Sequence, residues 1–394
     1  MRIGMILDAP YPTDPRVTHE AEALLEAGHE VFLFCFSFEK KYIPNESVLN
    51  IEVRRYYCSK LLYKLSALAY SIPFYKISVA KKIRHFIKSN GIEALHVHDL
   101  QVASAAFYAN DSFSLPIVLD LHENRPEIMK YYRHVQRFPG NLLISIKRWR
   151  LAEEYYVRQA TAVVVVTYFA KNELIKRTSI NPKRVVVMPN TVREAFYSEY
   201  PIDKKIVDRY ASKFVLLYLG NTSERRGLMT VLEAIPKLLK PIASLQLVVV
   251  GSSSFDKDLQ KRIDALNISE SVDLMGWQPE NTFPSYIAAA EVGISPLHSN
   301  LHHDTTYANK VFQYMSLGLP MLVSNVEAQQ FLIDTYASGL SHIPQDVEDF
   351  SKKVLHLYEN PEIRKKMASH GKKAILQQLN AQEATKELIS YYGH

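Results

Sequence analysis

Residues 309–324 read NKVFQYMSLGLPMLVS, and this stretch decides the fold. It predicts a helix that ends at Gly318, then Pro320, then a short buried strand at 321–324. A glycine just past a helix and a proline soon after it are the expected stop signals. The rest of the chain repeats this alternation of helix and strand.

The start of this helix is unusual. Thr305 and Thr306 are expected to cap it. Lys310 lies in its first turn, where the helix dipole disfavours a cation. A lysine is favourable there if an anion such as a phosphate docks on the free backbone N–H groups. The helix start therefore predicts an anion site.

Short apolar strands alternate with helices in two consecutive series. Continuous apolar runs such as Ala162–Val166 are typical of a parallel sheet buried on both faces. Two such series predict two doubly wound α/β domains joined within residues 189–201. The expected strands are 2–7, 31–36, 94–98, 116–121, 162–166 and 185–188, then 214–219, 245–250, 272–275, 292–296, 321–324 and 340–343.

The stretch 309–324 resembles a segment of GT-B glycosyltransferases of retaining family 4, in which Asn-Lys precedes Tyr-Met, Gly and Pro. The resemblance implies two Rossmann-like domains facing a central cleft. Residues 1–193 would form the acceptor domain, completed by the C-terminal helix at about 376–394. Residues 194–375 would bind the nucleotide-sugar donor. The family usually has glutamates where this chain has Thr305 and Gln313.

Ligands of open α/β sheets bind beyond the carboxyl ends of the strands. The loop that begins at Gly220 follows the first strand of the second series, and the resemblance implies that its Arg226, helped by Arg225, binds the donor diphosphate. Gly251 follows the next strand, in a Gly-x-Ser where the family often has Gly-x-Gly. The alternatives are a solvated loop with two surface arginines and, at Gly251, a plain turn.

The resemblance places other donor contacts around the Lys310 helix. Trp277 and Gln278 would flank the nucleobase, although a buried Trp277 packing between helices is the alternative. Gln313 would reach the ribose hydroxyls, because an amide both accepts and donates hydrogen bonds. The remaining expected donor-site residues are Asp304, in place of the missing glutamate at Thr305, then Thr305 itself, Asn309 and Glu327.

Two expected strands of the first domain end in a histidine followed by an acid. They read Leu95–Asp99 and Leu119–Glu123. His122 matches the family histidine that contacts the donor sugar near the anomeric centre. Asp99, Glu123 and Asp14 are the candidates on the acceptor side. The alternative for each histidine is that it has only a structural role.

The chain offers little that indicates a metal or cofactor. His298, His302 and His303 precede the key helix, but they lack the helical spacing of zinc sites. No G-x-G-x-x-G occurs, which argues against a nicotinamide dehydrogenase. The two cysteines give neither a metal spacing nor a disulfide framework and fit a reducing compartment. We expect neither metal nor cofactor.

Charge is distributed unevenly. Residues 1–190 hold 26 basic and 18 acidic residues, and the remainder holds 21 and 23. The excess lies in two acid-free stretches, 54–88 and 130–150, where Lys and Arg alternate with Leu, Ile and aromatic residues. Such stretches indicate contact with an anionic membrane surface, with an ordinary solvated face as the alternative. No nucleic-acid-binding motif is present.

Together with these features, the resemblance implies a retaining glycosyltransferase that moves a sugar from a nucleotide diphosphate donor to a glycan or lipid-linked acceptor in cell-surface polysaccharide or glycoconjugate synthesis. With no signal peptide and no membrane-spanning run expected, its predicted place is the cytoplasm, at the inner face of the membrane. Two alternatives remain. One is a GT-B nucleotide-sugar epimerase, and the other is a catalytically weak binding or assembly partner that lacks both family glutamates.

Overall fold

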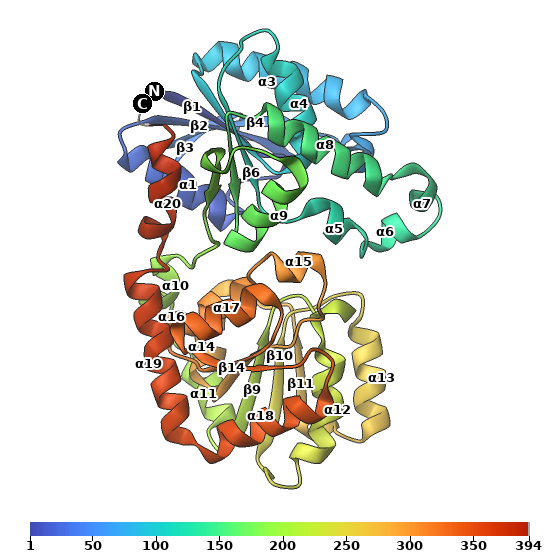
Figure 1. Cartoon of the computed structure of the whole chain (residues 1–394), viewed down its shortest axis with the longest axis vertical. Helices are drawn as coiled ribbons and strands as arrows, with labels where there is room; N and C mark the ends of the chain where they lie inside the picture. Colours follow the sequence, from blue (N-terminus) through green and yellow to red (C-terminus); the bar gives the residue numbers. More distant parts are fainter. Residues whose placement is uncertain (393–394) are drawn as a thin grey trace. The chain divides into compact units, whose positions relative to one another are not determined.

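The computed structural model describes residues 1–392 and divides the chain into two compact domains. The first contains residues 1–190 and the chain from Gln382 onward, and the second contains residues 191–381. Each is built on a largely parallel sheet with helices on both faces (Figure 1). None of the described helices is long and apolar enough to cross a bilayer.

The first domain is built on an eight-stranded sheet in the order β3-β4-β2-β1-β5-β6-β7-β8. All neighbours pair in parallel except β3 and β4, which are antiparallel. Chain order reverses at β1, so β1 and β5 flank the switch point where ligands of such sheets bind. The strands are β1 (Arg2–Ile6), β2 (Glu30–Ser37), β3 (Asn45–Val48), β4 (Ile51–Tyr57), β5 (Ala94–His98), β6 (Ile117–Leu121), β7 (Ala162–Val165) and β8 (Val185–Val187).

Helices cover both faces of this sheet because successive strand residues point to opposite sides. Val163 and Val165 of β7 pack in one core cluster, whereas Val164 lies in the other. The helices are α1 (Pro15–Glu26), α2 (Lys60–Lys64), α3 (Phe74–Asn90), α4 (Leu100–Asn110), α5 (Arg125–Met129), α6 (Arg133–Gln136), α7 (Gly140–Leu143), α8 (Ile146–Gln159), α9 (Tyr168–Thr178) and α20 (Ala381–Ser390), with 3₁₀ turns η1 (Leu65–Leu68) and η2 (Pro182–Arg184).

The second domain has six parallel strands in the order β11-β10-β9-β12-β13-β14. Its switch point lies between β9 and β12. The strands are β9 (Phe214–Leu219), β10 (Leu245–Val250), β11 (Val272–Gly276), β12 (Val292–Ser295), β13 (Met321–Ser324) and β14 (Gly339–His342). The helices are α10 (Glu194–Ser198), α11 (Lys204–Tyr210), α12 (Leu228–Leu238), α13 (Asp256–Leu266), α14 (Phe283–Ala288), α15 (Leu301–Asp304), α16 (Asn309–Ser316), α17 (Glu327–Tyr336), α18 (Val347–Glu359) and α19 (Pro361–Gln377), with 3₁₀ turns η3 (Glu224–Arg226), η4 (Ser269–Ser271) and η5 (Glu280–Thr282).

Tyr314 fixes helix α16 to the switch point. Its hydroxyl donates to the Leu217 carbonyl at 3.0 Å and accepts from the Leu219 N–H at 3.0 Å. The ring lies where Gly293 has no side chain, since a Cβ there would approach the ring to 2.5 Å. The first turn of α16 is therefore held beside the end of β9.

Two features differ from the sequence-based expectation. The pair β3 and β4 was not predicted. Only Ile51 and Val53 of β4 are buried, so this edge hairpin lacks the continuous apolar run of the central strands. The C-terminal helix expected at about 376–394 begins only at Ala381, because the chain breaks between α19 and α20, and residues 393 and 394 of that expectation lie outside the described part of the chain.

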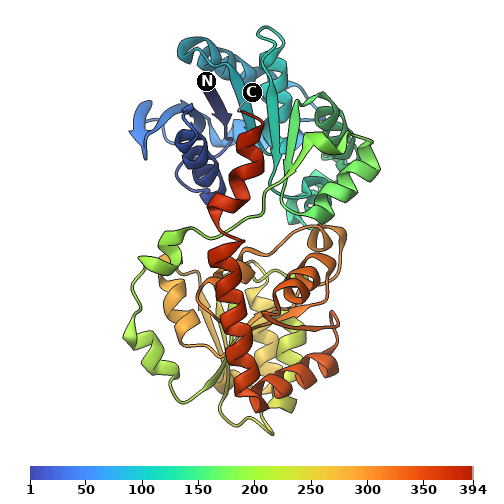
Figure 2. The ribbon, with the colours of Figure 1, turned by 60° about the vertical axis from the view of Figure 1, so that its left-hand side comes forward.

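Helices α19 and α20 belong to different domains. Met315 of α16 and Ala374 of α19 share a core cluster of the second domain. Leu388 and Tyr392 are buried in the first domain. The turned view shows α19 lying along the second domain and α20 along the first (Figure 2).

Candidate functional site

Lys310 is a buried cation without a counter-charge. Its side chain stands in the first turn of α16, only 6% of the residue is exposed, and its Nζ has no hydrogen-bond partner. The ammonium lies 3.3 Å from the centroid of the Tyr218 ring. Burying a charge in this way is unfavourable, so the group is poised to accept an anion.

Arg226 is a second cation beside Lys310. It ends η3, the turn that follows β9, and its Nε is buried without a partner. Burial, together with this guanidinium, holds the pKa of Lys310 well below its usual value. Among the described residues neither cation forms an ion pair with a carboxylate. Two basic groups without carboxylate partners at the carboxyl end of β9 make this a candidate anion site.

Arg225 is held by a histidine. Its Nη1 lies 2.7 Å from His303 Nε2, while His303 Nδ1 lies 2.7 Å from the His298 carbonyl. Burial and the nearby Arg226 lower the pKa of His303 to about 2, so the ring is neutral. A neutral ring that donates from Nδ1 accepts at Nε2, and His303 therefore positions Arg225.

The glycines of this site provide space. A Cβ on Gly251, whose φ is +139°, would stand 2.0 Å from the Gly220 carbonyl oxygen. A Cβ on Gly220 would stand 3.8 Å from Lys310 Cε. The backbone N–H of Gly251 already has a hydrogen-bond partner, because it donates to the Gly276 carbonyl at 2.7 Å. Gly251 thus brings the loops after β9 and β10 together and offers no amide to a ligand.

The predicted threonine cap of α16 is wrong. The N-cap is Ala308, which makes no side-chain cap. The Thr305 hydroxyl donates to the Leu301 carbonyl at 2.7 Å, and the Thr306 hydroxyl donates to the His302 carbonyl at 2.6 Å. Both threonines close the preceding helix α15, and the N-cap residue of α16 makes no side-chain capping hydrogen bond.

Gln313 is paired with a residue that sequence reasoning missed. Its Nε2 donates to Glu280 Oε1 at 3.2 Å. Glu280 is exposed and begins η5, after Trp277, Gln278 and Pro279. The carboxylate that the resemblance leads one to expect at position 313 is therefore supplied by a neighbouring loop. No sequence pattern connects two residues 33 positions apart.

The other predicted donor residues lie in the same domain. Trp277 is 74% exposed, which excludes the alternative of a buried aromatic, and Gln278 donates to the Met275 carbonyl at 3.0 Å. Asp304 and Glu327 lie together, since burial and the Glu327 carboxylate raise the pKa of Asp304. Asn309 is the first residue of α16.

In the first domain, His122 lies between two carboxylates. Its Nε2 is 2.8 Å from Asp120 Oδ2, and its Nδ1 is 3.4 Å from Asp14 Oδ2. Against the effect of burial, Asp120 raises the pKa of His122 well above its usual value. Also against burial, the hydrogen bond from His122 lowers the pKa of Asp14 to about 2. The charged form of His122 is therefore favoured, with its two N–H groups facing Asp120 and Asp14.

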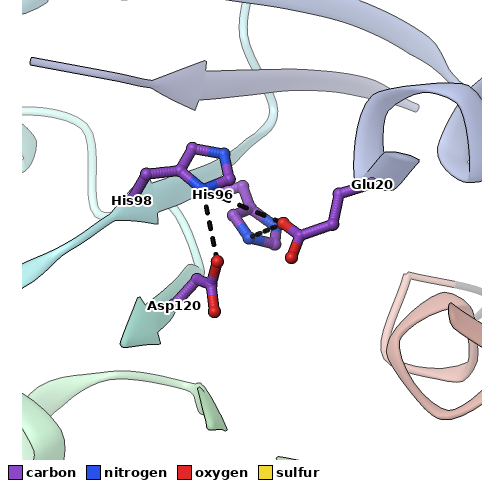
Figure 3. A group of neighbouring side chains, drawn as sticks. All are labelled: Glu20, His96, His98 and Asp120. Carbon is purple, nitrogen blue, oxygen red and sulfur yellow. Dashed lines mark hydrogen bonds and ion pairs between the residues drawn. The ribbon is translucent and has the colours of Figure 1, made fainter. Parts of the chain in front are cut away.

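Beneath His122 lies a fully buried group of side chains made of Glu20, His96, His98 and Asp120, shown in Figure 3. One ligand atom from each lies within 4.8 Å of the others, and this is the one such metal-like set within residues 1–392. His96 Nε2 is 2.9 Å from Glu20 Oε2, and His98 Nδ1 is 3.3 Å from Asp120 Oδ2.

Arg16 already supplies a cation to this group. Its guanidinium lies 3.1 Å from Glu20 Oε1 and 2.7 Å from Asp120 Oδ1, and it donates to the Met188 carbonyl at 2.8 Å. With the His122 imidazolium, two positive charges balance the two carboxylates. A divalent cation would add two charges to a balanced, buried group, which low polarity makes unfavourable. The chemistry of this set fits a positioning network for His122 better than a metal site.

Acidic side chains gather where β1 and β5 end. Arg125 lies 2.9 Å from Asp99 Oδ2 and 3.1 Å from Glu123 Oε1, so the structure brings these two predicted residues together. Asp8, which sequence analysis did not select, is 7% exposed with its Oδ2 unpartnered. Burial raises the pKa of Asp8 to about 6, although Arg125 opposes this. The signal for Asp8 was its position just after the first strand.

Comparison with known proteins gives consistent matches. The family model described as "Glycosyl transferases group 1" matches residues 200–374, and the model described as "Glycosyltransferase Family 4" matches residues 16–196. Phosphatidyl-myo-inositol mannosyltransferase of Mycolicibacterium smegmatis is 22% identical over 382 residues, which cover 92% of this chain and 86% of that protein.

Solved structures match over the whole chain. Sucrose-phosphate synthase from Thermosynechococcus elongatus has a TM-score of 0.79 at 17% identity and covers 100% of this chain and 98% of its own. An Anabaena protein solved in complex with UDP has a TM-score of 0.73 at 13% identity, with 100% and 99% coverage. At these identities the likeness establishes the fold. The matched family segments span nearly all of the sequence, and the chain belongs to the group 1, family 4 glycosyltransferases with the GT-B fold.

Proposed function

We propose that this glycosyltransferase moves a sugar, with retention of configuration, from a nucleoside diphosphate sugar to a glycan or lipid-linked acceptor. The observation that carries the donor assignment is the pair of buried cations, Lys310 and Arg226, without carboxylate partners. A diphosphate leaving group develops negative charge as the glycosidic bond breaks. Cations that are already positioned beside the leaving diphosphate stabilise the transition state more than the ground state, because the negative charge is larger in the transition state.

The nucleoside is bound, in this proposal, by the residues between β11 and α16. Glu280 and Gln313 accept from the two ribose hydroxyls, and the exposed Trp277 stacks on the base. Asp304, with its neighbour Glu327, accepts from sugar hydroxyls. The UDP-bound Anabaena protein of the same fold supports a nucleotide donor.

Metal ions and organic cofactors are not required in this scheme. Lys310, Arg226 and Arg225 supply the positive charge that a divalent cation supplies elsewhere. No protein nucleophile is needed if the acceptor attacks from the face of the leaving diphosphate and passes its proton to it. His122 then gives up its longer contact, to Asp14, and donates its Nδ1–H to a sugar oxygen near the anomeric carbon, while its Nε2–H stays on Asp120.

The acceptor assignment rests on the first domain and on a relative. Asp14, Asp99 and Glu123 offer carboxylates to hydroxyl groups. The relative from Mycolicibacterium smegmatis is named for phosphatidyl-myo-inositol, an acceptor that resides in a membrane. We place this enzyme at the inner face of the membrane, with the basic stretches 54–88 and 130–150 against anionic lipid.

The first experiment is calorimetry with UDP, GDP, ADP, CDP and dTDP. We expect one of them to bind selectively and Arg226→Ala to lose that binding. Arg209→Ala is the matched control, because Arg209 lies in the same domain and pairs with Asp273 at 3.1 Å. Absence of binding by every nucleotide would refute the donor site and favour a degenerate binding partner. Sugar conversion without any acceptor would instead establish an epimerase.

A further inference from the structure

A half-open cavity of about 620 Å³ lies in the first domain, outside the carboxylate cluster around His122. It is bordered by α2, η1, α5, α6, α7 and the start of α8. Its walls are mainly apolar and include Ala67, Leu68, Met129, Leu143, Ile144 and Trp149. A soluble domain seldom keeps an apolar hollow of this size unless something fills it.

The cavity has a fixed wall. The Trp149 indole N–H donates to the Ala67 carbonyl at 3.2 Å, and the ring meets Tyr70 edge-on at 4.8 Å. Trp149 is almost fully buried although it lines the hollow. Because the Trp149 ring is held by a hydrogen bond to η1 and by packing against Tyr70, this wall of the cavity is formed before any ligand binds.

The cavity shares one residue, Arg125, with the proposed acceptor site. Arg125 lines the cavity and is also the residue that binds Asp99 and Glu123. A molecule that fills the hollow would reach, at Arg125, the carboxylates that we assign to acceptor hydroxyls. The occupant therefore has an apolar part and a polar, hydroxyl-bearing part.

The rim carries the features of a membrane-facing surface. Leu61, Phe138 and Leu142 are more than two-thirds exposed and lie in the segments that border the cavity. The same segments belong to the two stretches that hold Lys and Arg but no Asp or Glu, 54–88 and 130–150. Exposed apolar side chains among basic residues suit an anionic lipid surface.

We propose that this cavity binds the hydrocarbon chain of a lipid-linked acceptor. The chain would leave the bilayer at the apolar rim and enter beside Trp149, with the polar headgroup at Arg125, Asp99 and Glu123. This inference rests on the proposed function and narrows it, since it selects lipid-linked acceptors from the broader class of glycans.

Trp149 provides a direct readout. The sequence has two tryptophans, so Trp277→Phe leaves Trp149 as the single one. In this background we would titrate an alkyl maltoside brominated near the end of its chain, below its critical micelle concentration, because bromine quenches tryptophan on contact. We expect saturable quenching by the brominated amphiphile and none by maltose.

Two adjacent leucines give a matched pair of variants. Leu143 lines the cavity and is 53% exposed, whereas Leu142 is 75% exposed and does not line it. Placing a charge at the cavity wall should weaken binding about tenfold in Leu143→Asp, because apolar contact is lost. Leu142→Asp should bind as the parent does. Equal effects of the two variants, or quenching that does not saturate, would overturn the cavity assignment.

A second arm uses anionic vesicles that contain a phospholipid brominated along its acyl chains. Quenching of Trp149 by these vesicles supports the binding of a lipid chain from a bilayer. Quenching by the free amphiphile but not by the vesicles would overturn the proposal that the occupant comes from a bilayer. Neither arm contains a nucleotide. If Trp149 is not quenched but one nucleoside diphosphate still binds selectively, the cavity assignment alone is refuted. If Trp149 is quenched as expected but no nucleoside diphosphate binds, the proposed donor function is refuted.

Discussion

The ammonium of Lys310 stands 3.3 Å from the centre of the Tyr218 ring. An aromatic face attracts a cation without neutralising it. A carboxylate in the same place would satisfy the lysine and repel a diphosphate. The Tyr218 hydroxyl is itself fixed, since it donates to the Asn221 carbonyl at 2.5 Å. The protein therefore holds a positive charge in position while leaving it free to bind an anion.

Replacing this lysine should separate stability from function. In Lys310→Met a buried, unpaired charge is exchanged for an apolar side chain of similar length. We expect the free energy of unfolding to rise by about 1–3 kcal/mol, while nucleoside diphosphate binding is lost. Urea unfolding and calorimetry would measure the two effects. Lys237→Met, at an exposed position, is the control. A less stable variant that still binds would contradict the assigned role.

Nucleotide binding should also take up protons. The pKa of Lys310 is held well below its usual value by burial and by Arg226. A bound diphosphate favours the charged form and raises that pKa, so affinity should increase as pH falls toward the lowered pKa of the unliganded lysine. Calorimetry in two buffers with different ionisation heats measures the uptake. If the wild-type protein binds the nucleotide without taking up protons, protonation of Lys310 is not coupled to binding.

Glu280 should determine how well the ribose is recognised. In Glu280→Gln a charged acceptor becomes neutral, and we expect nucleoside diphosphate affinity to fall about tenfold. The preference for ribose over 2′-deoxyribose should shrink as well. Adding Gln313→Glu to this variant should restore both, because a carboxylate then stands on α16. Glu270→Gln, on an exposed turn of the same domain, should change neither.

Asp8 should make stability depend on pH. Its pKa is raised from 3.8 to about 6 by burial. The ionised form is unfavourable in the folded state, so stability should decline as pH rises from 4 to 6 and stay low above that range. A shift of about two units corresponds to about 3 kcal/mol. Asp8→Asn should gain up to that amount at pH 8 and nothing below pH 4. Thermal unfolding across pH tests this, with the exposed Asp111→Asn as control.

The sequence was sufficient for the parts of the fold that depend on local pattern. Continuous apolar runs such as 162–166 identified central strands, and Gly318 with Pro320 ended α16 where predicted. Such signals are strong where a strand is buried on both faces and is apolar throughout, as β7 is. Strand β4, next to the edge strand β3, was not predicted because only Ile51 and Val53 are buried there.

The candidate site was only partly predictable. Lys310 and Arg226 stood out because each follows a local signal, a helix start and a strand end. The Glu280–Gln313 pair and the contact of Arg225 with His303 arise from chain folding between distant segments. The threonine cap failed because Thr305 and Thr306 had two helices within reach, and their hydroxyls serve the earlier one.

The return of α20 to the first domain affects how the chain can fold during synthesis. Leu388 and Tyr392 complete the core on which α1 packs, and the Tyr392 hydroxyl lies 2.9 Å from His96 Nδ1. These residues are translated after the entire second domain, which is continuous from residue 191 to 381. Domains generally fold as units as they emerge from the ribosome. The second domain can therefore reach its native state while the first, although it begins the chain, still lacks one side of its core.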